Sequence, residues 1–177
     1  MDNGLIPKRY AKALYKFALE KGETKKVYEL SKQVLEAFAA NPDFQKVLSN
    51  PFVPDEDKEK LLLTAGGNDP LFHQFVLLII NQKRVEFARA MMLAYRDIYR
   101  HENHISQAKI TTAVKLDETR MAKLRRLVAD AFKDSELEFT EAVDPSLIGG
   151  FLIDVDSVRM DASLSNELEQ LRQTLLR

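Results

Sequence analysis

The chain opens with apolar residues spaced as on one side of a helix. In the first such segment they follow Pro7 and stop at Gly22; these residues are Tyr10, Ala13, Leu14, Phe17 and Ala18. Positions three and four apart meet on one face of an α-helix, so this set is predicted to be the helix's inner face. The same spacing predicts five more helices, at about residues 24–38, 44–48, 55–67, 69–84 and 85–102.

Polar residues mark where some of these helices begin. Thr24 is placed to cap the second helix, and Asp69, followed by Pro70, is placed to cap the fifth. The fifth segment is apolar on nearly all sides, so we expect it at the buried centre of a bundle. Six helices with short connections over residues 1–104 predict a compact six-helix bundle.

After residue 104 the period of the apolar positions changes from helical to alternating. Alternation predicts strands at residues 108–114, 137–143, 150–155 and 158–162, the last two joined by a tight turn. Helical spacing returns at residues 117–132 and again at residues 163–177, where leucines stand at 164, 168, 171 and 175. Residues 105–177 are therefore predicted to form a small α+β domain, and the chain as a whole to be mainly α.

Composition narrows the class of protein. The 177 residues carry a formal net charge of −1 and no cysteine, which excludes disulfides and thiolate chemistry and suits a reducing compartment. The N-terminus lacks the apolar core of a signal peptide. The longest strongly apolar run, FVLLII, is far short of the roughly 20 residues that span a bilayer. We expect a soluble protein that reaches a membrane only through partners.

Few residues form a pattern that could carry chemistry. His101 and His104 have the spacing of a metal-binding pair, but no third ligand is apparent, and a solvated linker is favoured. Asp154 and Asp156 alternate on one predicted strand face, where paired carboxylates could bind calcium or do acid–base work; a solvated hairpin face is favoured. No cofactor, metal or catalytic site is expected.

Two basic clusters raise the question of nucleic acid. Lysines 8, 12 and 16 form a stripe on the first predicted helix, opposite its apolar face. A second cluster lies in the helix at residues 117–132; it consists of Arg120, Lys123, Arg125 and Arg126. Three lysines opposite an apolar face are usually the solvated side of a helix, and the second cluster has no interleaved aromatic residues. Solvated helix faces are therefore favoured, and weak RNA binding is kept only as an alternative.

The glycine pair Gly149–Gly150 fails the tests for a phosphate-binding loop. Such loops follow a strand and open a helix, with a lysine in the P-loop form, whereas this pair precedes a strand and no lysine follows. Glycine at a strand more often marks a bulge or a close approach of another backbone. We expect a close approach here.

Residues 143–175 resemble the signature region of the delta subunit of F-type ATP synthase, the family of the mitochondrial oligomycin-sensitivity-conferring protein. The matching features are IGG, an alternating strand, a tight turn, a strand ending near an aspartate and a leucine-spaced helix; the signature residues are Ile148, Gly149, Gly150, Phe151 and Asp161. The segments KRYAKALYKFALEKG, NPFVPDEDKEKLL and NQKRVEFARAMMLAY are also similar to the family's helices. Ala162, where many members carry glycine, and the acidic DVDS turn depart from the pattern.

The resemblance implies a non-catalytic stator subunit. Such a protein links the catalytic alpha/beta head to the b-subunit peripheral stalk, so that the head resists rotor torque during proton- or sodium-driven ATP synthesis. It would lie at the cytoplasmic face of a bacterial cell membrane, peripherally, as part of the complex. A helical scaffold or adaptor unrelated to ATP synthase remains the alternative.

The resemblance also implies where partners bind. The N-terminal helix of an alpha subunit would enter a groove between the first and fifth helices of residues 1–104; the expected lining is Tyr10, Ala13, Leu14, Phe17, Phe75 and Leu78. Residues 105–177 would contact the C-terminal ends of the b subunits. No nucleic acid and no direct membrane insertion are expected.

Overall fold

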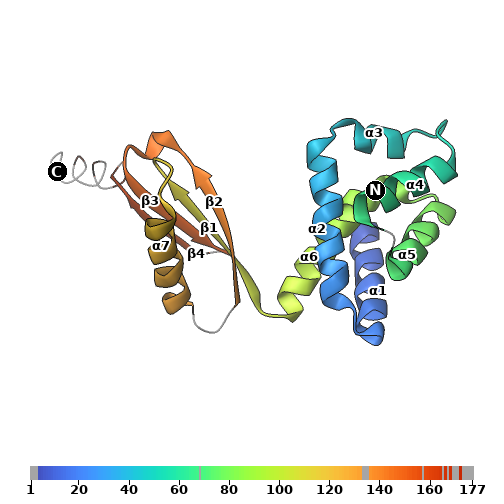
Figure 1. Cartoon of the computed structure of the whole chain (residues 1–177), viewed down its shortest axis with the longest axis horizontal. Coiled ribbons are helices and arrows are strands. Elements are labelled where there is room, and N and C mark those ends of the chain that lie inside the picture. Colours follow the sequence, from blue (N-terminus) through green and yellow to red (C-terminus); the bar gives the residue numbers. More distant parts are fainter. Residues whose placement is uncertain are drawn as a thin grey trace. The chain divides into compact units, whose positions relative to one another are not determined.

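A computed structural model describes residues 4–67, 69–132, 136–156, 158–164, 166, 168 and 172. The chain divides into two compact units, Met1–Arg100 and His101–Arg177 (Figure 1). The first is helical, and the second combines a sheet with a helix. The predicted fold class, a helical bundle followed by a small α+β domain, is confirmed.

The first unit consists of the six predicted helices. They are α1 (Leu5–Lys21), α2 (Thr24–Ala40), α3 (Asp43–Ser49), α4 (Asp55–Gly66), α5 (Pro70–Asn81) and α6 (Ala88–Glu102). A single 3-10 turn, Val85–Phe87, comes before α6 where the sequence predicts one continuous helix. Side chains from all six helices are buried in the core; among the most deeply buried are Leu14, Val27, Val34, Leu48, Leu62, Phe72, Val76, Ile79, Met91 and Tyr95.

The composition of helix α5 predicts burial on all sides, but the structure leaves one side of this helix partly exposed. Phe72, Val76 and Ile79 lie in the core, but Leu77 is 37% exposed and Leu78 is 46% exposed. The prediction of a fully buried central helix is therefore wrong for one face of α5. An apolar face that the bundle leaves uncovered needs an explanation, because such faces are common at binding sites.

The start of α5 is fixed by a buried carboxylate. Asp69 Oδ1 accepts hydrogen bonds from the backbone N–H groups of Leu71 (3.0 Å) and Phe72 (3.1 Å), as predicted for an N-cap. Its Oδ2 pairs with Lys26 of α2. Burial by itself raises the pKa of Asp69, but Lys26 and the two N–H donors outweigh burial and hold the pKa below its usual value. The cap predicted at Thr24 is wrong: Glu23 occupies the cap position, and neither side chain caps α2.

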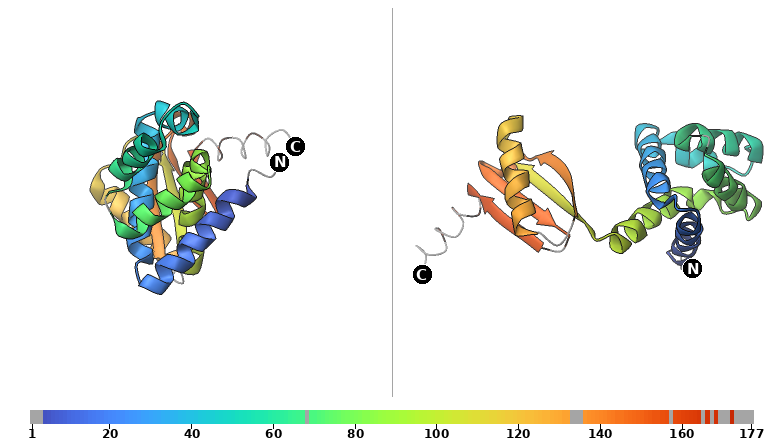
Figure 2. Two further views of the ribbon diagram at one scale, coloured as in Figure 1. Left: turned by 90° about the vertical axis from the view of Figure 1, so that its right-hand side faces the viewer. Right: turned by 60° about the horizontal axis from the view of Figure 1, so that its bottom comes forward.

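The second unit is a four-stranded sheet of order β2-β1-β3-β4. The strands are β1 (Ile105–Thr112), β2 (Glu136–Val143), β3 (Gly150–Val155) and β4 (Val158–Ser163), and α7 (Glu118–Ala131) connects β1 to β2. β1 pairs in parallel with β2 and antiparallel with β3, and β3 and β4 form the predicted hairpin. Helix α7 lies across one face of the sheet (Figure 2). The predicted closing helix, residues 163–177, falls mostly outside the described residues.

The glycine pair lies where β3 meets the end of β4. Gly150 has φ +78, and a Cβ there would come within 2.1 Å of the carbonyl oxygen of Ala162. At Gly149 a Cβ would come within 2.5 Å of Cδ1 of Leu164. The expected close approach of another backbone is confirmed at Gly150. The pair lets the hairpin close, which requires both the left-handed conformation and the missing side chain.

We predict that Gly150→Ala destabilises the hairpin. A left-handed non-glycine residue costs on the order of 1–3 kcal/mol, and the contact with Ala162 adds to this cost. Hydrogen exchange followed by mass spectrometry should then be faster in peptides that cover β3 and β4. The matched control is Gly4→Ala, because a Cβ at Gly4 meets nothing within 4 Å. Equal exchange in the two variants would contradict the role given to Gly150.

We also predict that the stability of the first unit depends on the charge of Asp69. Because the pKa of folded Asp69 is lowered, its charge stabilises the fold above the unfolded pKa of about 4 and less as pH falls below it. Urea unfolding followed by circular dichroism should therefore give a higher free energy of unfolding for wild type than for Asp69→Asn at pH 7. The difference between the two should shrink as the pH is lowered toward 3. Asp43→Asn is the control, since Asp43 pairs with Lys46 at the exposed surface. A difference that does not change with pH would contradict this account.

Candidate functional site

Helix α1 buries a narrower face than its sequence predicts. The buried residues are Pro7, Ala11, Leu14 and Ala18. Tyr10 and Phe17 are half-buried, and Ala13 is exposed. Each of these three precedes a core residue by one position, which places it about 100° around the helix. These three residues form a second apolar strip beside the buried face of α1. The core of the bundle does not cover this strip.

This strip and the exposed face of α5 enclose a hollow. Its volume is about 340 Å³, and it is lined by Tyr10, Ala13, Leu14, Phe17, Gln74, Phe75 and Leu78. All six residues expected at a binding groove thus lie at one hollow, with Gln74 as an addition. Leu14 and Phe75 are buried and form its floor, whereas Ala13 and Leu78 are exposed at its walls.

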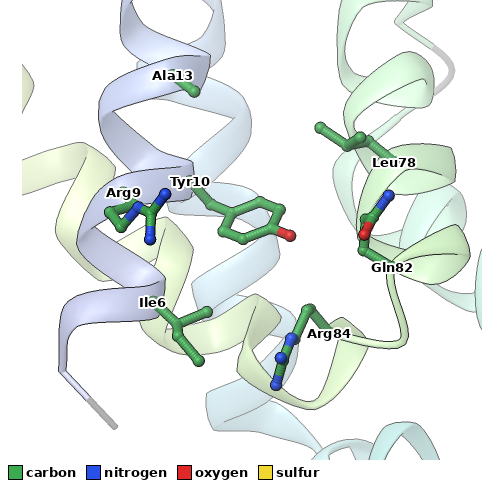
Figure 3. A pocket seen from close by; sticks show the side chains of 7 residues that line it. All are labelled: Ile6, Arg9, Tyr10, Ala13, Leu78, Gln82 and Arg84. Atoms are coloured by element: carbon green, nitrogen blue, oxygen red, sulfur yellow. The ribbon is translucent and has the colours of Figure 1, made fainter. Parts of the chain in front are cut away.

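A second hollow continues the first toward the start of α1. Its volume is about 430 Å³, and its lining is Ile6, Arg9, Tyr10, Ala13, Leu78, Gln82 and Arg84. Tyr10, Ala13 and Leu78 belong to both hollows, so the two form one continuous depression. We name it the α1–α5 groove. In Figure 3 the ring of Tyr10 points from α1 toward Leu78 and Gln82 of the opposite wall.

The two ends of the α1–α5 groove differ in chemistry. One end is apolar, with Phe17 and Phe75, and the other carries two guanidinium groups, Arg9 and Arg84. Sequence reasoning missed both arginines and Gln82. The only signals available were the position of Arg9 beside Tyr10 and of Arg84 just after the fifth helix, and neither shows that they share a hollow.

The second unit has a smaller apolar hollow of its own. Its volume is about 150 Å³, and it is lined by Leu127, Val128, Ala131, Phe132, Ile153, Val155, Val158 and Met160. Helix α7 provides one wall and β3 and β4 provide the other. Leu127 and Val158 are each more than half exposed, so the apolar rim extends onto the surface. We name this feature the α7–β4 hollow.

The signature residues lie elsewhere in the second unit. Ile148, Gly149, Gly150 and Phe151 form the entry to β3, and Asp161 lies in β4. Asp161 Oδ1 accepts a hydrogen bond from the backbone N–H of Ser163 (3.0 Å). Hydrogen bonds from the side chain and the backbone of Ser163 lower the pKa of Asp161. None of the five lines the α7–β4 hollow, so their contacts shape the hairpin.

The other candidates take part in ordinary surface contacts. Asp154 pairs with Arg159 (2.6 Å), and Asp156 stands in the turn rather than on the strand, where its Oδ1 accepts from Gln107 N–H (3.0 Å). His101 lies 3.7 Å from its neighbour Glu102. Neither histidine belongs to a metal site: among the described residues, no group of three or more His, Asp or Glu side chains could hold a metal ion.

The basic clusters are partly neutralised or dispersed. In α7, Arg120 pairs with Asp117, and Arg125 pairs with both Glu118 and Glu141. Lysines 8, 12 and 16 are exposed on α1. Within the described part of the chain, no helix has the length and apolar character needed to cross a membrane.

Comparisons with known proteins agree on one family. The family model described as ATP synthase delta (OSCP) subunit matches residues 6–175. ATP synthase subunit delta of Phocaeicola vulgatus is 35% identical over 176 residues, covering 98% of this chain and 95% of that protein. ATP synthase subunit delta of Prochlorococcus marinus strain AS9601 is 29% identical over 168 residues, covering 94% and 93%.

A solved structure supports the fold. A chain in the cryo-EM structure of the Toxoplasma gondii mitochondrial ATP synthase hexamer superimposes with a TM-score of 0.72 at 21% identity, and 97% of each chain is covered. The similarity therefore extends over both units.

The floor and the wall of the α1–α5 groove should respond differently to truncation. Leu14 is 3% exposed and Leu78 is 46% exposed. We predict that Leu14→Ala lowers the free energy of unfolding by about 2–5 kcal/mol, because it leaves a cavity in the core. Leu78→Ala should cost less than about 1 kcal/mol, because its side chain is already half in water. Urea unfolding of both variants checks this; similar losses would show that Leu78 belongs to the core.

Proposed function

Because the chain belongs to the ATP synthase delta (OSCP) subunit family, we propose that its α1–α5 groove receives the N-terminal helix of an alpha subunit. Membership in this family makes the protein a non-catalytic stator subunit of the F-type ATP synthase. It links the catalytic head to the peripheral stalk, so that the head resists the torque of the rotor. Its chemistry is therefore that of binding surfaces.

The observation that supports the groove assignment is the uncovered apolar strip of α1 facing the uncovered face of α5. A helix that docks in a groove needs an apolar floor and small residues that allow close approach. Leu14 and Phe75 supply the floor, and Ala13 supplies the small residue at the middle of one wall. From Ile6 to Phe17 the groove follows α1 for roughly 16 Å, which suits about three turns of a bound helix.

The apolar residues of the groove explain why a helix is a better occupant than an extended peptide. Extended peptides bind mainly by adding a strand to a sheet edge, and the first unit contains no strand among its described residues. An amphipathic helix instead presents a stripe of apolar side chains to the groove. Covering Tyr10, Phe17 and Leu78 then removes their exposed apolar surface from water, which favours binding.

We also propose that the second unit meets the C-terminal ends of the b subunits. The α7–β4 hollow supports this: its rim residues Leu127, Val158 and Met160 are about half exposed, although they continue the core of the sheet. One binding surface in each unit suits a protein that connects two parts of a larger assembly. At the bacterial cell membrane, the protein would then lie peripherally on the cytoplasmic face.

Of the alternatives, weak RNA binding has little support in the structure. Two of the four basic residues on α7, Arg120 and Arg125, pair with carboxylates. Binding to phosphates would have to displace these partners. A scaffold unrelated to ATP synthase is excluded by the family to which the chain belongs.

The test uses a peptide of about 20 residues from the N-terminus of the alpha subunit that is encoded with this chain. We predict a Kd in the micromolar range or below by isothermal titration calorimetry, and at least a tenfold loss in Ala13→Trp, whose new side chain fills the groove without disturbing the core. The chain should also rebind catalytic heads depleted of this subunit, with the peptide as a competitor.

The matched control is Ala39→Trp. Ala39 is an exposed alanine on α2 and does not line the groove. Equal binding by Ala13→Trp and Ala39→Trp would exclude the groove as the binding site. Failure of the peptide to bind wild type at micromolar concentration would exclude the partner.

A further inference from the structure

We propose that the α1–α5 groove recognises the direction of its bound helix by charge: Arg9 and Arg84 bind carboxylate side chains at one end of the helix's apolar stripe. This inference rests on the proposed function of the groove and adds the property by which the partner is oriented. It is carried by the unequal distribution of charge along the groove.

The two arginines come from different elements and share one hollow. Arg9 is on α1, and Arg84 lies between α5 and the 3-10 turn that precedes α6. Both are exposed, and neither guanidinium has a carboxylate partner among the described residues. Figure 3 shows Arg9 on α1 and Arg84 on the opposite side of the same end of the groove, with Ile6 and Tyr10 between them.

Two other cations near the groove are paired with carboxylates of the protein. Lys83, next in sequence to Arg84, binds Asp55 at 2.6 Å. Lys26 binds Asp69 at the other end of α5. Arg9 and Arg84 differ from these two lysines because they line the groove itself, whereas the exposed lysines 8, 12 and 16 of α1 do not.

The residues that line the opposite end of the groove carry no charge, and among the described residues a single cation lies beside that end: Lys21 Nζ is 5.9 Å from the centroid of the Phe17 ring. The residues that line the apolar hollow are aromatic, aliphatic or, in the case of Gln74, an uncharged amide. A carboxylate placed there would lose water beside apolar side chains with only the Lys21 ammonium nearby, whereas at Arg9 and Arg84 it finds two planar groups able to donate paired hydrogen bonds. Reversing the bound helix would therefore exchange a favourable contact for an unfavourable one.

Apolar contacts alone do not fix direction well. A stripe of apolar residues at three- and four-residue spacing presents nearly the same surface when the helix is reversed. Charged groups at one end remove this ambiguity, as charge patterns do at other interfaces, where they contribute more to specificity than to affinity. In a subunit that connects a head to a stalk, the direction of the bound helix decides where the rest of the alpha subunit lies.

The experiment measures binding of the alpha N-terminal peptide at low and high salt. The variant is Arg9→Gln/Arg84→Gln, and the control is Lys12→Gln/Lys16→Gln, which removes the same charge from exposed positions of α1 that do not line the groove. We expect about a tenfold weaker Kd for the arginine variant at low salt and less than a twofold change for the control. The loss should shrink at high salt.

Peptides with Glu and Asp replaced by Gln and Asn, at one end or at the other, locate the contact. Replacement at the end that meets the arginines should weaken binding to wild type and leave binding to Arg9→Gln/Arg84→Gln unchanged. Replacement at the other end should affect wild type little. An equal loss in the lysine control, or additive losses when peptide and protein changes are combined, would overturn the proposal.

The outcomes separate this proposal from the one on which it rests. If Ala13→Trp abolishes binding while Arg9→Gln/Arg84→Gln does not weaken it, the groove assignment stands and recognition by charge is wrong. If the peptide fails to bind wild type at all, both are wrong. Circular dichroism of the glutamine variants is expected to match wild type, because both arginines are exposed.

Discussion

The close packing of α1 against the rest of the first unit depends on two alanines. Ala11 and Ala18 are fully buried and stand on the same face as Leu14. Their small side chains let the α1 backbone approach the core, and this approach determines which strip of the helix is left over. If α1 were rotated so that Tyr10 and Phe17 faced inward, their rings would have to occupy the space that the alanines leave to the backbone. The groove is thus a consequence of how α1 is held.

The second wall of the groove is set by a different interaction. Asp69 caps α5 and pairs with Lys26 of α2, so that the first turn of α5 is tied to a neighbouring helix. Phe72, Val76 and Ile79 then pack inward, and Leu77 and Leu78 stay partly exposed at the surface. Core packing thus sets the orientation of both α1 and α5, and their uncovered apolar strips line the same groove.

Local signals in the sequence were sufficient for the elements but not for the distinction between core and surface. Alternation and helical spacing locate the strands and helices, since burial imposes those periods. Tyr10 and Ala11 are both apolar and adjacent, however, so spacing alone does not tell which one faces the core. The wrong cap at Thr24 has a similar cause: a residue type that often caps a helix does not fix where the first turn begins.

The six predicted groove residues were identified through the resemblance to a family, whereas Arg9 and Arg84 were identified only from the fold. Arg9 and Arg84 are far apart in sequence and stand in segments with many other charged residues. Only the antiparallel course of α1 and α5 along the groove brings them to one end. Convergence of this kind has no periodic signature, which is why sequence reasoning did not find it.

The order of the strands bears on how the second unit carries force. The chain enters this unit through β1, which is hydrogen-bonded to β2 on one side and to β3 on the other. Tension applied along β1 from its start acts parallel to the strand, so the hydrogen bonds on both sides are loaded together in shear. A strand at the edge, pulled from its end across the sheet, would instead peel away one bond at a time. Entry through a central strand therefore means that tension along β1 is shared by its hydrogen bonds to both β2 and β3.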